Sequence, residues 1–151
     1  MTKGKFLTVE GVEGVGKSSN MDFICDLLER NHIPAVTTRE PGGTFCGERI
    51  REILLDKRVL DLSPVAELSL LFAARAQHVY EVIKPALDKG SWVVCDRFTD
   101  STYAYQGGGR QLSMQLIAAV EALTLDGFRP DYTLLLDLDV ADGLNRAANV
   151  G

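Results

Sequence analysis

The chain has 151 residues, of which 46% are hydrophobic and 25% are charged, and this composition is typical of one ordinary folded domain. A formal net charge of −5 argues against binding to nucleic acid through a basic face, although a few arginines in one pocket can still hold a small anionic ligand. The apolar runs are too short to cross a membrane and the three cysteines are odd in number, so we expect a cytoplasmic protein with reduced thiols and no membrane partner.

The first part of the chain alternates between strand-like and helix-like patterns. Strands are predicted at residues 5–10 and 35–38, where short β-rich runs end at loops. Apolar residues recur at helical spacing from Lys17 to Asn31 and again over residues 44–56, so a helix is predicted after each strand.

A longer helical stretch is predicted from Ser63 to Gly90. Ser63 can cap its start, and Pro64 fits the first helical position. Pro85 lies inside the stretch and lacks a backbone N–H, so it should bend or split the helix.

The rest of the chain continues the alternation. Residues 92–95 are continuously apolar, which favours a strand covered on both faces. A helix is predicted at 114–125, a strand at 132–136 and a further helix at 137–148. This order predicts a three-layer α/β/α fold with a parallel central sheet and a site at the carboxyl ends of its strands.

A phosphate-binding loop of the pattern G-x-x-x-x-G-K-[ST] follows the first predicted strand. Its residues are Gly11, Val12, Glu13, Gly14, Val15, Gly16, Lys17 and Ser18. Glycines let successive amide N–H groups turn toward a phosphate, Lys17 reaches the β- and γ-phosphates, and the Ser18 hydroxyl is suited to Mg²⁺. The loop does not choose between a kinase, a GTPase and a motor ATPase, but an Asn-Lys-x-Asp base-reading motif is absent.

Three further clusters are rich in arginine, whose planar guanidinium grips phosphate bidentately. The first runs from Arg39 through Glu40 to Arg51, the second surrounds Arg75, and the third begins at Asp96–Arg97. Phosphoryl transfer between nucleotides needs positioned cations and Mg²⁺ more than a covalent nucleophile.

These residues together resemble the bacterial thymidylate kinase family. The resemblance rests on Arg-Glu-Pro-Gly-Gly-Thr from Arg39, Asp-Arg-Phe from Asp96 and Ala-Tyr-Gln-Gly-Gly-Gly-Arg from Ala104, beside the phosphate loop. It runs from Phe6 to about Ala148. It implies a homodimeric enzyme that transfers phosphate from ATP to dTMP with Mg²⁺, giving ADP and dTDP on the route to dTTP.

The resemblance also implies roles at the acceptor site. Glu13 matches a carboxylate near the deoxyribose 3′-hydroxyl, and Arg51 and Arg97 match the arginines that hold the dTMP phosphate. Arg75 matches the arginine that contacts thymine O4, and Gln106 and Thr102 match polar contacts to the base. Glu40 matches a carboxylate that lines the site, and Phe72 or Leu71 matches the aromatic or apolar residue that stacks on thymine.

On the donor side, the resemblance implies that the phosphate loop and Ser19 bind ATP. Lys17, Arg97, Asp96 and Glu13 are the expected catalytic residues, and Ser18 and Asp96 are the expected metal contacts. Arg146 matches a residue that packs against adenine.

Several residues have ordinary structural interpretations as well. Arg75 could pair with Glu67 or Glu81, and Phe72 could be plain core. The others are Glu40 as a turn cap, Arg49 as a solvated charge, Asp137 and Asp139 as helix caps, 107–109 as a hinge or close backbone approach, and His32 and His78 without a functional role.

The resemblance continues, in the family, past the point where this sequence stops. Residues 137–148 match a helix that leads there into an arginine-rich lid, and the phosphate loop itself carries no arginine at its variable positions. We therefore expect residues 1–151 to form a single P-loop kinase domain truncated at the start of the lid. The alternatives are a kinase for another nucleoside monophosphate and a non-catalytic nucleotide-binding module.

Overall fold

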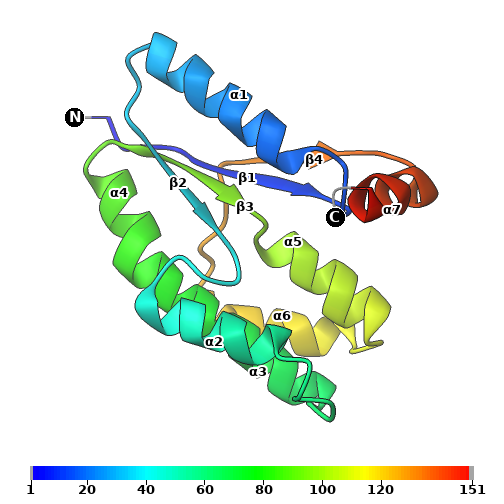
Figure 1. Ribbon diagram of the computed structural model, residues 1–151. Helices are drawn as coiled ribbons and strands as arrows, with labels where there is room; N and C mark the ends of the chain where they lie inside the picture. The colour runs from blue at the N-terminus through cyan, green and yellow to red at the C-terminus, as the bar shows by residue number, and fades with distance from the viewer. Residues whose placement is uncertain (1, 150–151) are drawn as a thin grey trace. The chain divides into compact units, whose positions relative to one another are not determined.

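The computed structural model describes residues 2–149, and the chain divides into two compact units. The first unit contains the residues up to 38, residues 86–98 and the residues from 130 on. The second contains residues 39–85 and 99–129. Each unit is described by itself below (Figure 1).

A parallel sheet forms the centre of the first unit. Its strands are β1 (Phe6–Gly11), β2 (Ala35–Arg39), β3 (Trp92–Asp96) and β4 (Tyr132–Leu136), in the order β2-β3-β1-β4. β1 pairs in parallel with both β3 and β4. The three middle residues of β3 are fully buried, as its continuous apolar pattern predicts, whereas most of β4 is exposed at the edge of the sheet.

The register brings two predicted functional segments to neighbouring strand ends. Val9 of β1 pairs with Asp96 of β3, and the Arg97 backbone N–H donates to Val9 O over 3.0 Å. The loop after Gly11 and the Asp96–Arg97 pair therefore leave the sheet side by side. Parallel sheets bind ligands at such a point, where the strand order reverses.

Two helices accompany this sheet. α1 (Lys17–Arg30) lies along one face of it (Figure 1), and its Met21 and Leu28 form a buried cluster with Val9 and Val94. α7 (Val140–Ala148) begins three residues later than the predicted helix at 137–148, because Asp139 is its N-cap and accepts a hydrogen bond from Ala141 N at 2.9 Å.

The second unit is helical. Its elements are α2 (Phe45–Leu55), α3 (Pro64–His78), the π-helix η1 (Val79–Ile83), the start of α4 (Lys84–Asp88), α5 (Thr99–Thr102), the π-helix η2 (Tyr103–Gly109) and α6 (Met114–Leu125). α3 packs against both α2 and α6. Thr44, Ser63 and Ser113 cap α2, α3 and α6 through their hydroxyl oxygens, and the Ser63–Pro64 start was predicted.

The predicted break near Pro85 takes the form of a π-helix. Because Pro85 has no backbone N–H, the ordinary helical ladder cannot continue through it. The turn before it widens, and Lys84 N donates to Val79 O, five residues back. None of the helices within residues 2–149 combines the length and the apolar character needed to cross a bilayer.

The segment after Arg97 differs from expectation. Residues 107–109 were predicted to be a hinge or a close backbone approach, yet they end the π-helix η2. A Cβ atom on Gly107 would stand 2.9 Å from the Met114 methyl, whereas nothing lies within 4 Å of the same position on Gly108 or Gly109. Only Gly107 is therefore in a close approach.

Candidate functional site

The phosphate loop lies in the first unit between β1 and α1, as predicted. Gly14 and Gly16 adopt φ angles of 73° and 92°, a left-handed region that glycine tolerates and residues with a side chain rarely adopt. Gly16 is also the N-cap of α1, so the unpaired N–H groups of the first helical turn open on the loop. A helix N-terminus behind a glycine loop is an anion site.

α7 packs directly on this loop. A Cβ atom on Gly14 would stand 2.1 Å from Gly143 O and 3.1 Å from Arg146 Cβ. A Cβ atom on Gly143 would in turn stand 2.6 Å from Glu13 O. The two glycines let the helix and the loop touch, and Arg146 leaves α7 beside the loop.

Lys17 is a mostly buried cation at the start of α1. Its Nζ donates to Gly11 O at 3.2 Å and Val12 O at 3.3 Å, both carbonyls of the phosphate loop. Burial lowers the pKa of Lys17 below its ordinary value, and the charge of Arg97 lowers it further, while Asp96 is among the carboxylates that oppose the shift. An anionic ligand at the loop would favour the charged ammonium.

Asp96 has a buried side-chain oxygen, Oδ1, that lacks a hydrogen-bond partner. Within residues 2–149 it is the one buried side-chain oxygen or nitrogen atom in this condition. Such an atom is costly unless it serves a ligand or an ordered water. Ser18 is an exposed residue on the first turn of α1. Carboxylate and hydroxyl oxygens are hard donors of the kind that Mg²⁺ takes, so the two residues fit that ion. No group of three or more His, Cys, Asp or Glu side chains in the described chain is placed to hold a metal by itself.

Arg97 stands at the end of β3 in an uncommon backbone conformation. Its φ is 70°, which is strained for a residue with a side chain and is a mark of functional positions. The backbone is held there because Phe98 N donates to Glu10 Oε1 at 2.7 Å. Arg97 Nη2 donates to Glu13 Oε1 at 2.9 Å, so two of the predicted acceptor-site residues lie together.

Glu10 was not predicted. It is 4% exposed at the end of β1 and accepts the hydrogen bond from Phe98 N. The available signal was a carboxylate near the end of a mostly apolar strand, because a buried charge in such a strand needs a fixed partner.

In the second unit, Arg75 is the centre of a buried polar network. Its Nε donates to Glu40 Oε2 at 2.5 Å and its Nη1 donates to Thr102 Oγ1 at 3.0 Å. The side chains of Arg75 and Glu40 are each 3% exposed. The structure therefore brings three predicted acceptor-site residues together, Arg75, Thr102 and Glu40. Arg75 pairs with Glu40, which was not among the alternative partners considered, and Glu40 is an ion-pair partner.

His78 belongs to the same network, although no role was predicted for it. It is completely buried on α3, three residues after Arg75, and its Nδ1 lies 2.9 Å from Glu40 Oε1. Each oxygen of the Glu40 carboxylate thus contacts a nitrogen-bearing side chain of α3. The spacing of Arg75 and His78 on one helical face was the only local hint.

Phe72 lies against this network. It is 0% exposed, and the Arg75 guanidinium lies 4.8 Å from its ring centroid, a cation–π contact. Leu71, the other candidate for the stack on thymine, is half-buried. Which of the two stacks on a base stays a prediction.

Arg51 projects from α2 toward the loop after β2. Its Nη1 donates to Pro41 O at 3.0 Å. Glu48 holds the same loop in place. Its carboxylate accepts a hydrogen bond from Gly43 N and pairs with Arg39, and both contacts lower the pKa of Glu48. Arg49 forms an exposed pair with Glu52, as expected of a solvated helix charge.

Gln106 lies in η2 and is 8% exposed. Its Nε2 donates to Glu67 Oε1 at 2.7 Å. η2 is held to α6 by a hydrogen bond from the Tyr103 hydroxyl to Glu121, and burial together with that contact raises the pKa of Tyr103 to about 12. Thr102 and Gln106 therefore sit on a braced segment.

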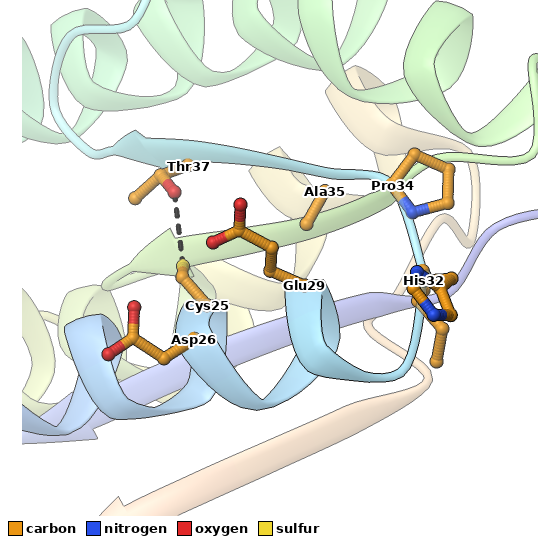
Figure 2. A pocket seen from close by; sticks show the side chains of 8 residues that line it. Cys25, Asp26, Glu29, His32, Pro34, Ala35 and Thr37 are labelled. Carbon is orange, nitrogen blue, oxygen red and sulfur yellow. Dashed lines mark hydrogen bonds between the residues drawn. The ribbon is translucent and has the colours of Figure 1, made fainter.

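A cavity of about 570 Å³ lies elsewhere in the first unit, between α1 and β2 (Figure 2). Cys25, Asp26, Glu29 and Thr37 are among its lining residues, and Cys25 Sγ and Thr37 Oγ1 are 3.2 Å apart. None of the predicted site residues lines this cavity. It is separate from the candidate site.

The phosphate loop behind a parallel strand and the strand order define a P-loop nucleotide-binding protein. A sequence model of the family described as "Thymidylate kinase" matches residues 9–151. The chain belongs to the thymidylate kinase family.

Two similar proteins and one solved structure support this family assignment. Thymidylate kinase of Chromohalobacter salexigens is 56% identical over 152 aligned residues, which include 100% of this chain and 72% of that protein. Thymidylate kinase of Ruthia magnifica is 52% identical over 100% of this chain and 74% of its own length. A crystal structure of thymidylate kinase from Ehrlichia chaffeensis matches with a TM-score of 0.81 and 36% identity, covering 97% of this chain and 78% of that one.

The comparisons confirm the predicted fold class, a parallel sheet flanked by helices of the P-loop type. They also confirm the predicted family, and they favour neither another kind of P-loop kinase nor a non-catalytic module.

Proposed function

We propose that this chain is a thymidylate kinase, which transfers the γ-phosphoryl group of ATP to dTMP and releases ADP and dTDP. Family membership supports this function. The single observation that carries it is the buried Arg75 held by Glu40 and Thr102. Burying a charged group costs free energy unless the group has good partners. A protein that used ATP only as a switch would have no use for a buried and fixed cationic donor of this kind.

The donor side uses the phosphate loop. Its N–H groups and Lys17 bind the β- and γ-phosphates of ATP, with Ser18 and Ser19 on the first turn of α1. Lys17 gives up its bonds to Gly11 O and Val12 O to do so. Arg146, which leaves α7 beside the loop, packs against the adenine.

Ser18 and Asp96 hold Mg²⁺, directly or through its water molecules, and the partnerless Asp96 Oδ1 supports this role. When bound, Mg²⁺ neutralises charge on the phosphates of ATP during transfer.

The acceptor phosphate is held by Arg51 and Arg97, whose guanidinium groups suit its oxygens. Arg97 is presented at the end of β3 by its strained backbone. Its contact with Glu13 also fixes that carboxylate, which is the proposed partner of the deoxyribose 3′-hydroxyl.

The base is read by the second unit. Arg75 donates to thymine O4, Gln106 and Thr102 contact the base edge, and Glu40 fixes Arg75. Phe72 or Leu71 stacks on the ring. Thymine offers an acceptor at position 4 where cytosine offers an amino donor, so a fixed Arg75 favours thymine.

The chemical step needs no covalent intermediate. A phosphate oxygen of dTMP attacks the γ-phosphorus of ATP, and the bond between that phosphorus and the β–γ bridging oxygen breaks, so the electron pair leaves with ADP. Charge spreads over the equatorial oxygens in the transition state. Lys17 and Arg97 stabilise that charge, with Asp96 and Glu13 orienting their partners.

A cytoplasmic location and a homodimer, two further properties of the family, are proposed as well. The three cysteines, Cys25, Cys46 and Cys95, are free thiols, which suits a cytoplasmic location. Several large apolar side chains of the helical unit are exposed, which suits a homodimer. They are Phe45, Ile53 and Leu55 of α2, Val65 of α3, and Met114, Leu116 and Leu123 of α6.

The proposal is tested by binding. Titration calorimetry should show that dTMP binds to the protein at least about tenfold more tightly than dCMP, because a mismatched donor at position 4 leaves Arg75 facing another donor. ADP with Mg²⁺ should bind independently of which pyrimidine is present. Equal affinities for dTMP and dCMP would rule out the proposed base reading.

A further inference from the structure

Glu67 contacts a proposed base-reading residue but has no role in the reaction described above. It lies in the first turn of α3, and its carboxylate is partly exposed. Oε1 accepts from Gln106 Nε2 at 2.7 Å, and Oε2 accepts from Arg110 Nη2 at 3.2 Å. Arg110 is itself anchored, because Nη2 also donates to Leu62 O at 2.7 Å. The carboxylate is therefore fixed on both sides.

This contact determines how the Gln106 amide is turned. An amide has a donor end and an acceptor end, and an ionised carboxylate can only accept. The NH₂ group must therefore face Glu67, and Oε1 must face away from it. Gln106 Oε1 accepts no hydrogen bond in residues 2–149 and is absent from the buried partnerless atoms, so solvent reaches it.

We propose that Glu67 is a positioning residue that sets pyrimidine specificity by fixing the orientation of the Gln106 amide. Thymine carries a hydrogen on N3, which an exposed amide oxygen can accept. Cytosine carries a lone pair at the same atom, which would face that oxygen. A freely turning amide would satisfy either base by presenting its oxygen or its nitrogen, so the constraint from Glu67 creates the discrimination at N3, in addition to that of Arg75 at position 4. The inference rests on the proposed function, in which Gln106 contacts the base.

The same reasoning limits the role of Glu67 to one choice between bases. Uracil and thymine have the same N3–H and O4 edge and differ only in the methyl group. Glu67 therefore contributes to the choice between dTMP and dCMP and contributes nothing to the choice between dTMP and dUMP.

The test is the Glu67→Gln variant, in which residue 67 can donate or accept and no longer fixes the amide. The dTMP-to-dCMP affinity ratio, measured by calorimetry, should fall by about tenfold, the scale of one hydrogen bond. The dTMP-to-dUMP ratio should not change. Glu52→Gln makes the same chemical change on the exposed face of α2 and should leave both ratios unchanged.

Two further variants separate positioning from folding. In a Gln106→Ala background, Glu67→Gln should have no additional effect on the dTMP-to-dCMP ratio, because the two residues act as one unit. Arg110→Ala removes the second support of the carboxylate and should lower the same ratio by a smaller factor. If Glu67→Gln does not fold, Arg110→Ala is the deciding variant. An unchanged dTMP-to-dCMP affinity ratio in Arg110→Ala would then overturn the proposal.

The outcomes also separate this inference from the proposed function. A parent protein that binds dTMP no better than dCMP contradicts the function itself. A parent that discriminates, with a Glu67→Gln variant that keeps the parental ratio or weakens both nucleotides equally, overturns only the role of Glu67.

Discussion

Replacing Lys17 by alanine is expected to slow phosphoryl transfer from ATP to dTMP by about a hundredfold or more, because losing a fixed cation at the transferring group typically costs about 3 kcal/mol of transition-state stabilisation. Lys17 stands at the start of α1 with its ammonium on two carbonyls of the phosphate loop. Burial already disfavours the charge, as its lowered pKa shows. The fold should therefore survive the loss.

The measurement is single-turnover transfer with γ-labelled ATP, with thermal unfolding recorded beside it. Lys89→Ala, which removes an exposed lysine from the same unit, is the matched control and should keep the parental rate. A folded Lys17→Ala variant with more than half of the parental rate would remove Lys17 from the mechanism.

Replacing Arg75 by alanine is expected to have two effects, because this residue both supports the fold and reads the base. The Glu40 carboxylate, 3% exposed, loses its guanidinium partner, and breaking a buried pair in this way costs about 3–5 kcal/mol of stability. The dTMP affinity should fall by about a hundredfold, the upper range for a charged hydrogen bond, and the preference over dCMP should shrink by at least about tenfold, to the part contributed by Gln106.

A double variant separates the two effects. Arg75→Leu with Glu40→Leu removes both charges and should recover much of the stability, because apolar residues can replace a buried ion pair. It should not recover the parental dTMP-to-dCMP affinity ratio. Thermal unfolding and calorimetric titration are measured on the same samples. A double variant that keeps the full parental dTMP-to-dCMP affinity ratio would show that Arg75 does not read the base.

Local patterns predicted the regular elements well. The predicted helix at 114–125 and the predicted strand at 132–136 match α6 and β4 residue for residue. Both depend on periodicity over neighbouring residues, which a sequence displays directly. The Ser63–Pro64 start and the break before Pro85 were predictable for the same reason, since capping and the missing N–H are local chemistry.

The phosphate loop was also predictable, because its function requires glycine and lysine at fixed spacing. The contact of the loop with α7 was not. Gly14 and Gly143 touch across more than a hundred residues of sequence, and no local pattern reports such a contact.

The buried polar contacts mark the limit of sequence reasoning. Arg75 was singled out, but its pairing with Glu40, which lies 35 residues away in the sequence, was not predicted; the partners considered, Glu67 and Glu81, lie closer to it in the sequence. His78 could not be assigned without knowing that it shares this carboxylate. Pairing across elements depends on tertiary packing, so the residues were predictable but their partners were not.

The most direct test of the proposed function is the transfer reaction itself. The protein is incubated with γ-labelled ATP, Mg²⁺ and equal concentrations of dTMP, dCMP, dAMP and dGMP, and the products are separated by chromatography. A thymidylate kinase that uses the site described above should place the label in dTDP faster than in any other diphosphate, with ADP formed in equal amount. Label that enters another nucleoside diphosphate faster, or dTMP that stays unphosphorylated while ATP is consumed, would contradict it.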